Sequence, residues 1–296
     1  MHQTVGFPLA WVYSRAMLEP LYLSHDQLGE GPVWHANEQA LYWVDIEGRK
    51  VQRYVPETKE HQQWHLRERV CGVAPRRGGG LVVALEHDLT IFDSATADIT
   101  PFASLDTDKP KNRNNDMKCD PQGRLWVGTM QSDAQGRAGS LYRVNAHGSV
   151  SKMLGNIGIA NTLAWSPDES QFYFADSSQN VIWVFDYDAP SGDISKQRIF
   201  FEGGPGAPDG SAMDSQGYLW NARYGGSCVL RIAPDGTLEQ TLEIPAENPT
   251  SCAFGGADLK TLFVTSAGGE NAAAYEGCVF SAQVEVAGKK VGEFAD

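Results

Sequence analysis

Four polar residues stand at the same distance ahead of a recurring apolar phrase, and their oxygen atoms could together hold a cation. Two are carboxylates and two are amides, each 10 or 11 residues before one copy of the phrase: Glu30, Asn115, Asn161 and Asp209. Cys71 and Ser251 occupy this place before the other two copies. Carboxylates crowded together repel each other and resist desolvation, and a bound cation removes both penalties.

A ligand set made only of oxygen atoms favours a hard cation. We therefore expect one divalent metal ion, with Ca²⁺ as the first expectation and Mg²⁺ or Mn²⁺ as alternatives. Zn²⁺ or Fe²⁺ could enter the same cage, although these ions more usually bring His or Cys ligands. The competing interpretation is that the polar groups cap strand ends or bind water, and spacing alone does not separate the two.

The apolar phrase recurs six times. Its copies are Leu41–Asp45, Leu81–Leu85, Leu125–Thr129, Phe172–Asp176, Leu219–Arg223 and Leu262–Ser266. Successive copies begin 40 to 47 residues apart, and each follows a turn rich in residues such as Pro, Asp, Asn or Gly. A period of this length made only of short strands is typical of propeller blades. We therefore predict an all-β fold, a six-bladed β-propeller with four-stranded antiparallel blades around a central channel.

This architecture would bring the polar residues together. We expect each phrase to be the third strand of its blade and each polar residue to lie near the start of the innermost strand. Innermost strands line the channel, so their ends at one face look at one another across the axis. We assign residues 17–296 to a single propeller domain and residues 1–16 to an N-terminal extension of unknown role.

Composition limits the partners. A formal net charge of −13 argues against nucleic acid and anionic membranes, because both require a basic surface. No apolar run is long enough to span a bilayer, and no Lys or Arg precedes the apolar stretch Gly6–Tyr13, which disfavours a signal peptide. Five scattered cysteines without a C-x-x-C pair fit reduced thiols in a cytoplasmic protein. We expect a monomer or a weak homo-oligomer.

Several segments carry a family resemblance. Leu28–Trp34, Arg113–Met130 and Pro208–Gly210 resemble the regucalcin/gluconolactonase (senescence-marker protein) family, in order and at the proper spacing. Cys252–Gly256 with Asp258–Leu262 resembles the final-blade motif of its bacterial sugar-lactonase branch. The similarity covers roughly residues 25–285. It implies a six-bladed propeller that hydrolyses sugar lactones with a divalent metal ion.

The resemblance also implies a division of roles. By motif match, the metal ligands are Glu30, Asn161 and Asp209, and the substrate-contacting residues are Arg113, Asn115 and Asp116. The sequence departs from the family pattern at three places. Met117 stands where Gly usually follows Asn-Asp, Thr162 replaces the usual Gly after the ligand Asn, and the segment Gln131–Ala138 looks shorter than the corresponding lid of animal members. These departures bear on substrate size and preference more than on the metal.

A lactone is a cyclic ester, so its hydrolysis needs a polarised carbonyl, an attacking water and stabilisation of the oxyanion. A metal ion can supply the first and the third. Asp209 is the candidate general base for the water, and a hydroxide held by the metal is the alternative. Arg113 and Asn115 would hold sugar hydroxyls or the ester oxygen. Asp116 would accept hydrogen bonds from sugar hydroxyls, or would cap the start of its strand.

We therefore expect a metal-dependent carboxylic ester hydrolase of sugar catabolism, acting on an aldonolactone such as arabinono-, xylono-, galactono- or gluconolactone. Two other functions stay open: a phosphotriester or aryl-ester hydrolase, and a non-catalytic calcium-binding propeller. The chain has no Gly-x-Ser-x-Gly elbow, so a serine esterase has no visible nucleophile. Arg113 with two amides and Asp116 favours a polyhydroxylated substrate over an apolar ester.

Overall fold

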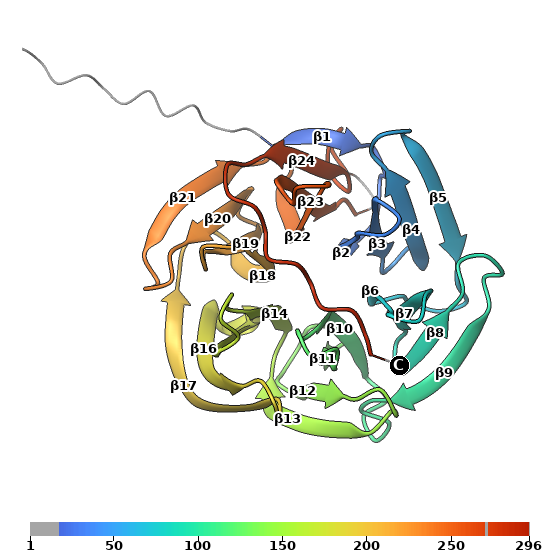
Figure 1. Ribbon diagram of the computed structural model, residues 1–296, viewed down its shortest axis with the longest axis vertical. Coiled ribbons are helices and arrows are strands. Elements are labelled where there is room, and N and C mark those ends of the chain that lie inside the picture. Colours follow the sequence, from blue (N-terminus) through green and yellow to red (C-terminus); the bar gives the residue numbers. More distant parts are fainter. Residues whose placement is uncertain (1–17, 270–271, 296) are drawn as a thin grey trace, which may run out of the picture.

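Six four-stranded antiparallel sheets are arranged in a ring around a central axis (Figure 1). The computed structural model describes residues 18–269 and 272–295. The prediction of an all-β, six-bladed β-propeller is confirmed. The expected N-terminal extension, residues 1–16, lies outside the described residues.

Five blades each consist of four consecutive strands, which run from the innermost to the outermost position. The first three contain β2 (Gly29–His35), β3 (Ala40–Asp45), β4 (Lys50–Val55) and β5 (Glu60–His65); β6 (Gly72–Pro75), β7 (Leu81–Ala84), β8 (Asp88–Phe92) and β9 (Ile99–Ser104); and β10 (Asn112–Cys119), β11 (Leu125–Gln131), β12 (Gly139–Val144) and β13 (Val150–Ile157). The next two contain β14 (Ala160–Trp165), β15 (Gln171–Asp176), β16 (Val181–Asp188) and β17 (Asp193–Glu202); and β18 (Ala207–Met213), β19 (Leu219–Tyr224), β20 (Cys228–Ile232) and β21 (Leu238–Glu243). A short 3₁₀ turn, η1 (Ser177–Gln179), follows β15.

The sixth blade joins the two ends of the described chain. It contains β22 (Asn248–Gly255), β23 (Thr261–Ala267), β24 (Val279–Gln283) and, on the outside, β1 (Glu19–Tyr22). Because β1 pairs antiparallel with β24, the first strand completes the last blade and closes the ring. Ring closure through shared strands prevents the first and last blades from separating, and leaves only short outer edges.

Each recurring phrase forms the second strand of its blade, so the expectation that it would be the third strand was wrong. β3, for example, pairs with β2 on one side and with β4 on the other. The turn Ala36–Gln39 is too short to hold another strand, so the phrase is the direct hairpin partner of the innermost strand. The polar residues nevertheless lie on innermost strands, as expected.

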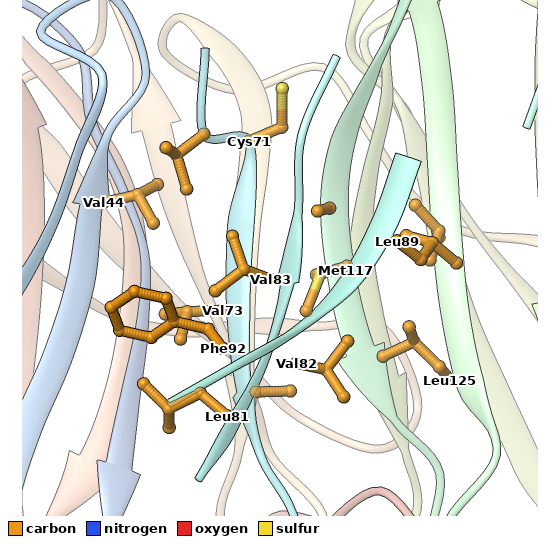
Figure 2. Close-up of a cluster of buried hydrophobic side chains, with 14 of the residues drawn as sticks. Val44, Cys71, Val73, Leu81, Val82, Val83, Leu89, Phe92, Met117 and Leu125 are labelled. Atoms are coloured by element: carbon orange, nitrogen blue, oxygen red, sulfur yellow. The ribbon is translucent and has the colours of Figure 1, made fainter. Parts of the chain in front are cut away.

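The core lies between neighbouring blades, and therefore the second strands are buried on both faces. Figure 2 shows both faces of the second blade, where Val82 and Leu89 lie toward Leu125 of the third blade and Phe92 lies on the opposite side, toward Val44 of the first. The outermost strands face solvent, and exposed and less exposed residues do not alternate regularly along them. In β17, for example, most side chains are exposed. All five cysteines are free and buried. Among the described residues, no helix has the length and apolarity needed to cross a membrane.

The chain after β24 crosses the ring at one face of the propeller (Figure 1). We call this segment, residues 284–295, the C-terminal strap. Its Lys289 N donates to Met213 O over 2.8 Å, and its Phe294 N donates to Pro75 O over 2.8 Å. The Phe294 side chain is 2% exposed and packs into the core cluster of the first three blades. The strap therefore covers the C-terminal ends of the innermost strands.

Candidate functional site

The innermost strands are distorted where the polar residues stand. In the four strands that carry them, two residues face a single residue of the second strand, which is a β-bulge at or just after the polar residue. The bulged pairs are Gly31-Pro32, Asn115-Asp116, Thr162-Leu163 and Asp209-Gly210. Bulges bend a strand and re-aim its side chains, and they are common beside active sites. The inner strand β6, which carries no polar site residue, has a regular ladder.

Two glycines of the sequence motifs have clear roles in these bulges. Gly31 adopts φ +54°, a conformation that glycine reaches at little cost. A Cβ at Gly210 would overlap the side chain of Ser251 on the neighbouring blade. The glycine that follows each carboxylate, Glu30 and Asp209, therefore lets the inner strands bend and approach one another.

Three carboxylates share one buried space at this end of the channel. Glu30, Asp116 and Asp209 are 9%, 8% and 6% exposed. The Glu30 carboxylate accepts a hydrogen bond from Gly31 N over 2.8 Å. In contrast, Asp116 Oδ2 and Asp209 Oδ1 are buried with no hydrogen-bond partner among the described residues. Oxygen atoms left in this state are costly, because burial removes their water without replacing it.

The pKa values of these carboxylates show how close they lie. Burial, with the charge of Asp116, raises the pKa of Glu30 to about 8. Burial also raises the pKa of Asp209 well above its ordinary value, and the charges of Glu30 and Asp116 add to this shift. Burial raises the pKa of Asp116, against the opposing charge of Lys118. Burial and mutual repulsion thus disfavour simultaneous ionisation of these groups, and the charges of Arg113 and Lys118 oppose this effect only in part.

The two amides are in direct contact. Asn115 Nδ2 donates to Asn161 Oδ1 over 2.9 Å, and Asn161 Nδ2 donates to Ser177 Oγ over 2.8 Å. Ser177 Oγ then donates to Pro208 O, beside Asp209. This chain of hydrogen bonds ties three neighbouring blades together. Asn161 Oδ1 keeps a second lone pair that could bind another group.

Arg113 completes the polar ring. Its side chain is mostly buried, and its Nη1 donates to Asn115 Oδ1 over 2.7 Å and to Asn114 O over 2.9 Å. The positive charge of Arg113 lowers the pKa values of Glu30 and Asp209 against the effect of burial. A guanidinium held in this way keeps its positive charge at a fixed place near the carboxylates.

All the residues singled out from the sequence lie on innermost strands near this end of the channel, and none is turned outward into bulk solvent. They are Glu30 on β2, Arg113, Asn115 and Asp116 on β10, Asn161 on β14 and Asp209 on β18. The other two blades contribute Cys71, whose pKa burial raises to about 11, and Ser251. Their convergence is a property of the structure, whereas their division into metal ligands and substrate contacts stays a prediction.

The residues fit a divalent cation. Within residues 18–269 and 272–295, no three His, Cys, Asp or Glu side chains are grouped as a metal cage. A cation at this place would therefore need the amide oxygen of Asn161 beside the carboxylates of Glu30 and Asp209. A cation here would satisfy the buried, unpartnered Asp209 Oδ1 and would offset the burial that raises the pKa values of Glu30 and Asp209. Oxygen ligands of this kind suit Ca²⁺ well.

Two further residues of the site, Lys118 and Asn221, were not singled out from the sequence. Lys118 Nζ donates to Ser211 O over 2.5 Å inside the channel, and its charge lowers the pKa values of Glu30 and Asp116. A signal was available, because residues two apart in a strand share a face and Lys118 follows Asp116 at this spacing. Asn221 donates to Asp209 O over 3.0 Å from the second strand of the blade.

The structure shows what two of the departures from the family pattern contact. Met117 points away from the site into the core, against Gly72, where a Cβ would lie 2.6 Å from Met117 Cγ. The larger residue thus fills space that Gly72 leaves on the neighbouring strand. The segment Gln131–Ala138 is held to the fourth blade by Arg137, which pairs with Asp176 at 3.0 Å.

Comparisons with known proteins agree with this arrangement. Residues 28–268 match the model of the SMP-30/Gluconolactonase/LRE-like region. Pentonolactonase XacC of Haloferax volcanii is 39% identical over 82% of this chain and 83% of its own length. The 6-deoxy-6-sulfogluconolactonase of Pseudomonas putida is 37% identical over 88% of this chain and 92% of its own length.

A solved structure shows the same fold. Regucalcin of Agrobacterium tumefaciens, described as a calcium-binding protein, superimposes with a TM-score of 0.90 at 31% identity, covering 94% of this chain and 97% of its own. The resemblance inferred from the sequence motifs is therefore confirmed. The chain belongs to the SMP-30/gluconolactonase/LRE-like family, whose members include proteins named as sugar lactonases.

Proposed function

We propose that this protein is a divalent-metal-dependent hydrolase that opens an aldonolactone to the sugar acid. The observation that carries the proposal is the buried group of Glu30, Asp116 and Asp209, with unpartnered oxygen atoms on Asp116 and Asp209. Such a group is unfavourable in an empty channel and favourable around a cation. The names of the lactonase relatives support the choice of reaction.

In this proposal Glu30, Asn161 and Asp209 hold the cation, which would polarise the lactone carbonyl and stabilise the negative charge that develops on its oxygen. Asp209 accepts the proton of the attacking water on the carboxylate oxygen that the cation does not hold. Burial and the nearby carboxylates raise the pKa of Asp209 in the metal-free site, and a bound cation would lower it again.

The substrate would be oriented by the residues of β10. Arg113 and Asn115 are already connected through a 2.7 Å hydrogen bond, so their donors have fixed directions. Asp116 Oδ2 has no partner among the described residues and can accept a hydrogen bond from a sugar hydroxyl. Donors and acceptors side by side suit a polyhydroxylated ring, because every hydroxyl both donates and accepts.

The proposal is tested by following acid release from a panel of arabinono-, xylono-, galactono- and gluconolactone. The protein is first treated with chelator, and Ca²⁺, Mn²⁺, Mg²⁺ or Zn²⁺ is then added back. We expect turnover of at least one lactone, its loss after chelation and its recovery with the metal. Turnover that is insensitive to thorough chelation would contradict the metal dependence.

The same experiment separates the two other candidate functions. Cation binding without turnover of any lactone would favour a non-catalytic calcium-binding propeller. Faster hydrolysis of aryl esters or phosphotriesters than of every lactone would favour the second enzyme class. Spontaneous lactone opening is subtracted with a protein-free blank in the same buffer and with the same metal ion.

A further inference from the structure

Thr162 adopts an unusual backbone conformation beside the candidate site. Its φ is +55°, in the left-handed region, and the residue is fully buried in the bulge of β14. A β-branched side chain is strongly disfavoured there, because its Cβ substituents crowd the backbone. Conformations of this kind persist only where the surroundings hold them in place.

The first blade provides a built-in comparison. Gly31 follows Glu30 in the bulge of β2 and has φ +54°, nearly the same as Thr162, which follows Asn161 in β14. Glycine satisfies this conformation without strain. The bulge geometry itself therefore does not require a side chain at position 162, and the threonine must be judged by what its side chain contacts.

The hydroxyl of Thr162 reaches the neighbouring blade. Thr162 Oγ1 donates to Asp209 O over 2.5 Å and lies 3.0 Å from Ser211 Oγ. Asn221 Nδ2 donates to the same Asp209 O over 3.0 Å and lies 3.2 Å from Thr162 Oγ1. Two donors from two blades thus clasp the backbone carbonyl of Asp209.

The Asn221 side of this clasp is itself held rigidly. Arg223 Nη1 donates to Asn221 Oδ1 over 3.1 Å, and the Arg223 side chain is fully buried. Arg223 also donates to Pro205 O over 2.8 Å and to Gly203 O over 2.7 Å. The backbone N–H of Thr162 lies near the Asp116 carboxylate and lowers its pKa.

We propose that Thr162 is a positioning residue, which accepts a strained backbone so that its hydroxyl fixes Asp209 in the bulge of β18. The residue lies between two of the carboxylates, with its N–H toward Asp116 and its hydroxyl on Asp209 O. Small misplacements of reacting groups are expensive, so holding the Asp209 backbone at this point governs cation affinity and turnover. The role assigned to Asp209 rests on the proposed function.

Three substitutions at position 162 separate the effect of losing the hydroxyl group from the effect of relieving the backbone strain. Thr162→Val keeps the branched shape and the strain but loses the hydroxyl. Thr162→Gly loses both, and Thr162→Ser keeps the hydroxyl with less crowding. The matched control is Thr90→Val, since Thr90 is also fully buried and its Oγ1 donates to Val83 O over 3.2 Å, away from the site.

We expect Thr162→Val and Thr162→Gly to lower kcat and cation affinity by about 10- to 100-fold, the usual cost of removing a supporting partner of a metal site, with a smaller change in KM. Thr162→Ser restores both values to within about threefold of the wild type, well inside that range. Thr162→Gly melts at a higher temperature than Thr162→Val, because the glycine relieves the strain. Thr90→Val lowers the melting temperature and leaves kcat unchanged.

Two results would overturn the proposal: wild-type kcat and cation affinity in Thr162→Val, or failure of Thr162→Ser to restore what Thr162→Val loses. Crystal structures of the wild type and Thr162→Val give a readout that needs no activity. A displaced or disordered Asp209 in the variant supports the proposal, and an unchanged Asp209 contradicts it. If the wild type opens no lactone, the proposed function fails, while this comparison still decides the role of Thr162.

Discussion

The two ends of the central channel are built from the same innermost strands but from opposite kinds of residue. The N-terminal to central parts of these strands carry Glu30, Asp116 and Asp209, and five of the six strands are bulged there. The C-terminal halves have regular ladders and apolar side chains such as Trp165 and Phe254, which face the strap. We call these ends the mouth and the base.

One scaffold thus supports two tasks. At the base the cavity between the strap and side chains such as Trp165 and Phe254 is ≈ 50 Å³, which has room for no more than a few water molecules, and a more open hollow of ≈ 300 Å³ lies beside the strap near Arg77 and Glu169. At the mouth, buried charge and left-handed backbone both oppose folding. The carboxylates there are less than a tenth exposed and Thr162 has φ +55°, so the apolar packing of the base and blades must offset these costs.

The largest expected effect comes from removing the proposed base at the mouth. Asp209→Asn should lower kcat for the best lactone by about 10²- to 10⁴-fold, the usual contribution of a general base, while the fold is kept. The measurement is the acid-release assay on metal-loaded protein. Asp168→Asn, in an exposed turn near the base of the channel, is the matched control and should keep wild-type turnover. Undiminished turnover of Asp209→Asn would remove this residue from the chemistry.

A substitution at the base of the channel should have the reverse signature. Phe294→Ala removes a buried aromatic side chain from the strap and should cost about 3–5 kcal/mol of unfolding free energy. Turnover at room temperature should stay close to that of the wild type, because the strap lies at the other end of the channel. Denaturant unfolding gives the first quantity, with Leu238→Ala on the exposed face of β21 as control. A variant as stable as the wild type would show that the strap does not anchor the base.

Glu30→Gln should sharpen the comparison, because it alters charge with little change in volume. We expect cation affinity to fall by about 100-fold or more, since even the partners that support metal ligands account for 10- to 100-fold. The chelated variant should be at least as stable as chelated wild type, because a buried carboxylate is gone. Calorimetric titration with Ca²⁺ measures the affinity, and Glu169→Gln, beside the strap, is the control. Equal affinities in Glu30→Gln and wild type would reject Glu30 as a ligand.

The smallest predicted effect is a pH dependence of cation binding. The pKa of Glu30 is raised to about 8, so below that pH a proton occupies this carboxylate and must leave when a cation binds. Affinity should therefore weaken by about tenfold per pH unit below 8 for each proton released.

The raised pKa of Glu30 also determines how the stability of the metal-free protein changes with pH. The pKa of Glu30 in the folded state lies above its value in the unfolded state, so protonated Glu30 stabilises the metal-free fold at low pH. This stabilisation is lost as the pH rises through about 8. Added cation should cancel the loss. Titrations in buffers of different ionisation enthalpy measure the released protons, and binding at pH 7 without proton release would contradict the raised pKa.

Much of the fold and the placement of the site follow from local patterns. The six phrases and their turns predict six blades, because each hairpin forms between segments that are close together in the sequence. The same spacing places Glu30, Asn161 and Asp209 on innermost strands. The predicted place of the phrase within a blade was wrong, because the periodicity does not indicate whether the phrase pairs directly with the innermost strand.

Other features depend on contacts between distant parts of the chain. Nothing near Phe294 indicates that it packs into the first three blades, and nothing near β1 indicates that it completes the sixth. The bulges are equally hard to predict from the sequence, because a shift of register depends on both strands and leaves no periodic signal. The only sequence signal for the left-handed conformation of Thr162 is that this residue replaces the family's usual glycine.

Whether the mouth holds a cation can be decided by locating one in the channel. Crystals soaked in Mn²⁺ would be measured at a wavelength where manganese scatters anomalously. We predict one strong peak at the mouth, within bonding distance of side-chain oxygens of Glu30, Asn161 and Asp209. A fully soaked crystal with no peak there, or with its peak among other residues, would contradict the metal site and the mechanism built on it.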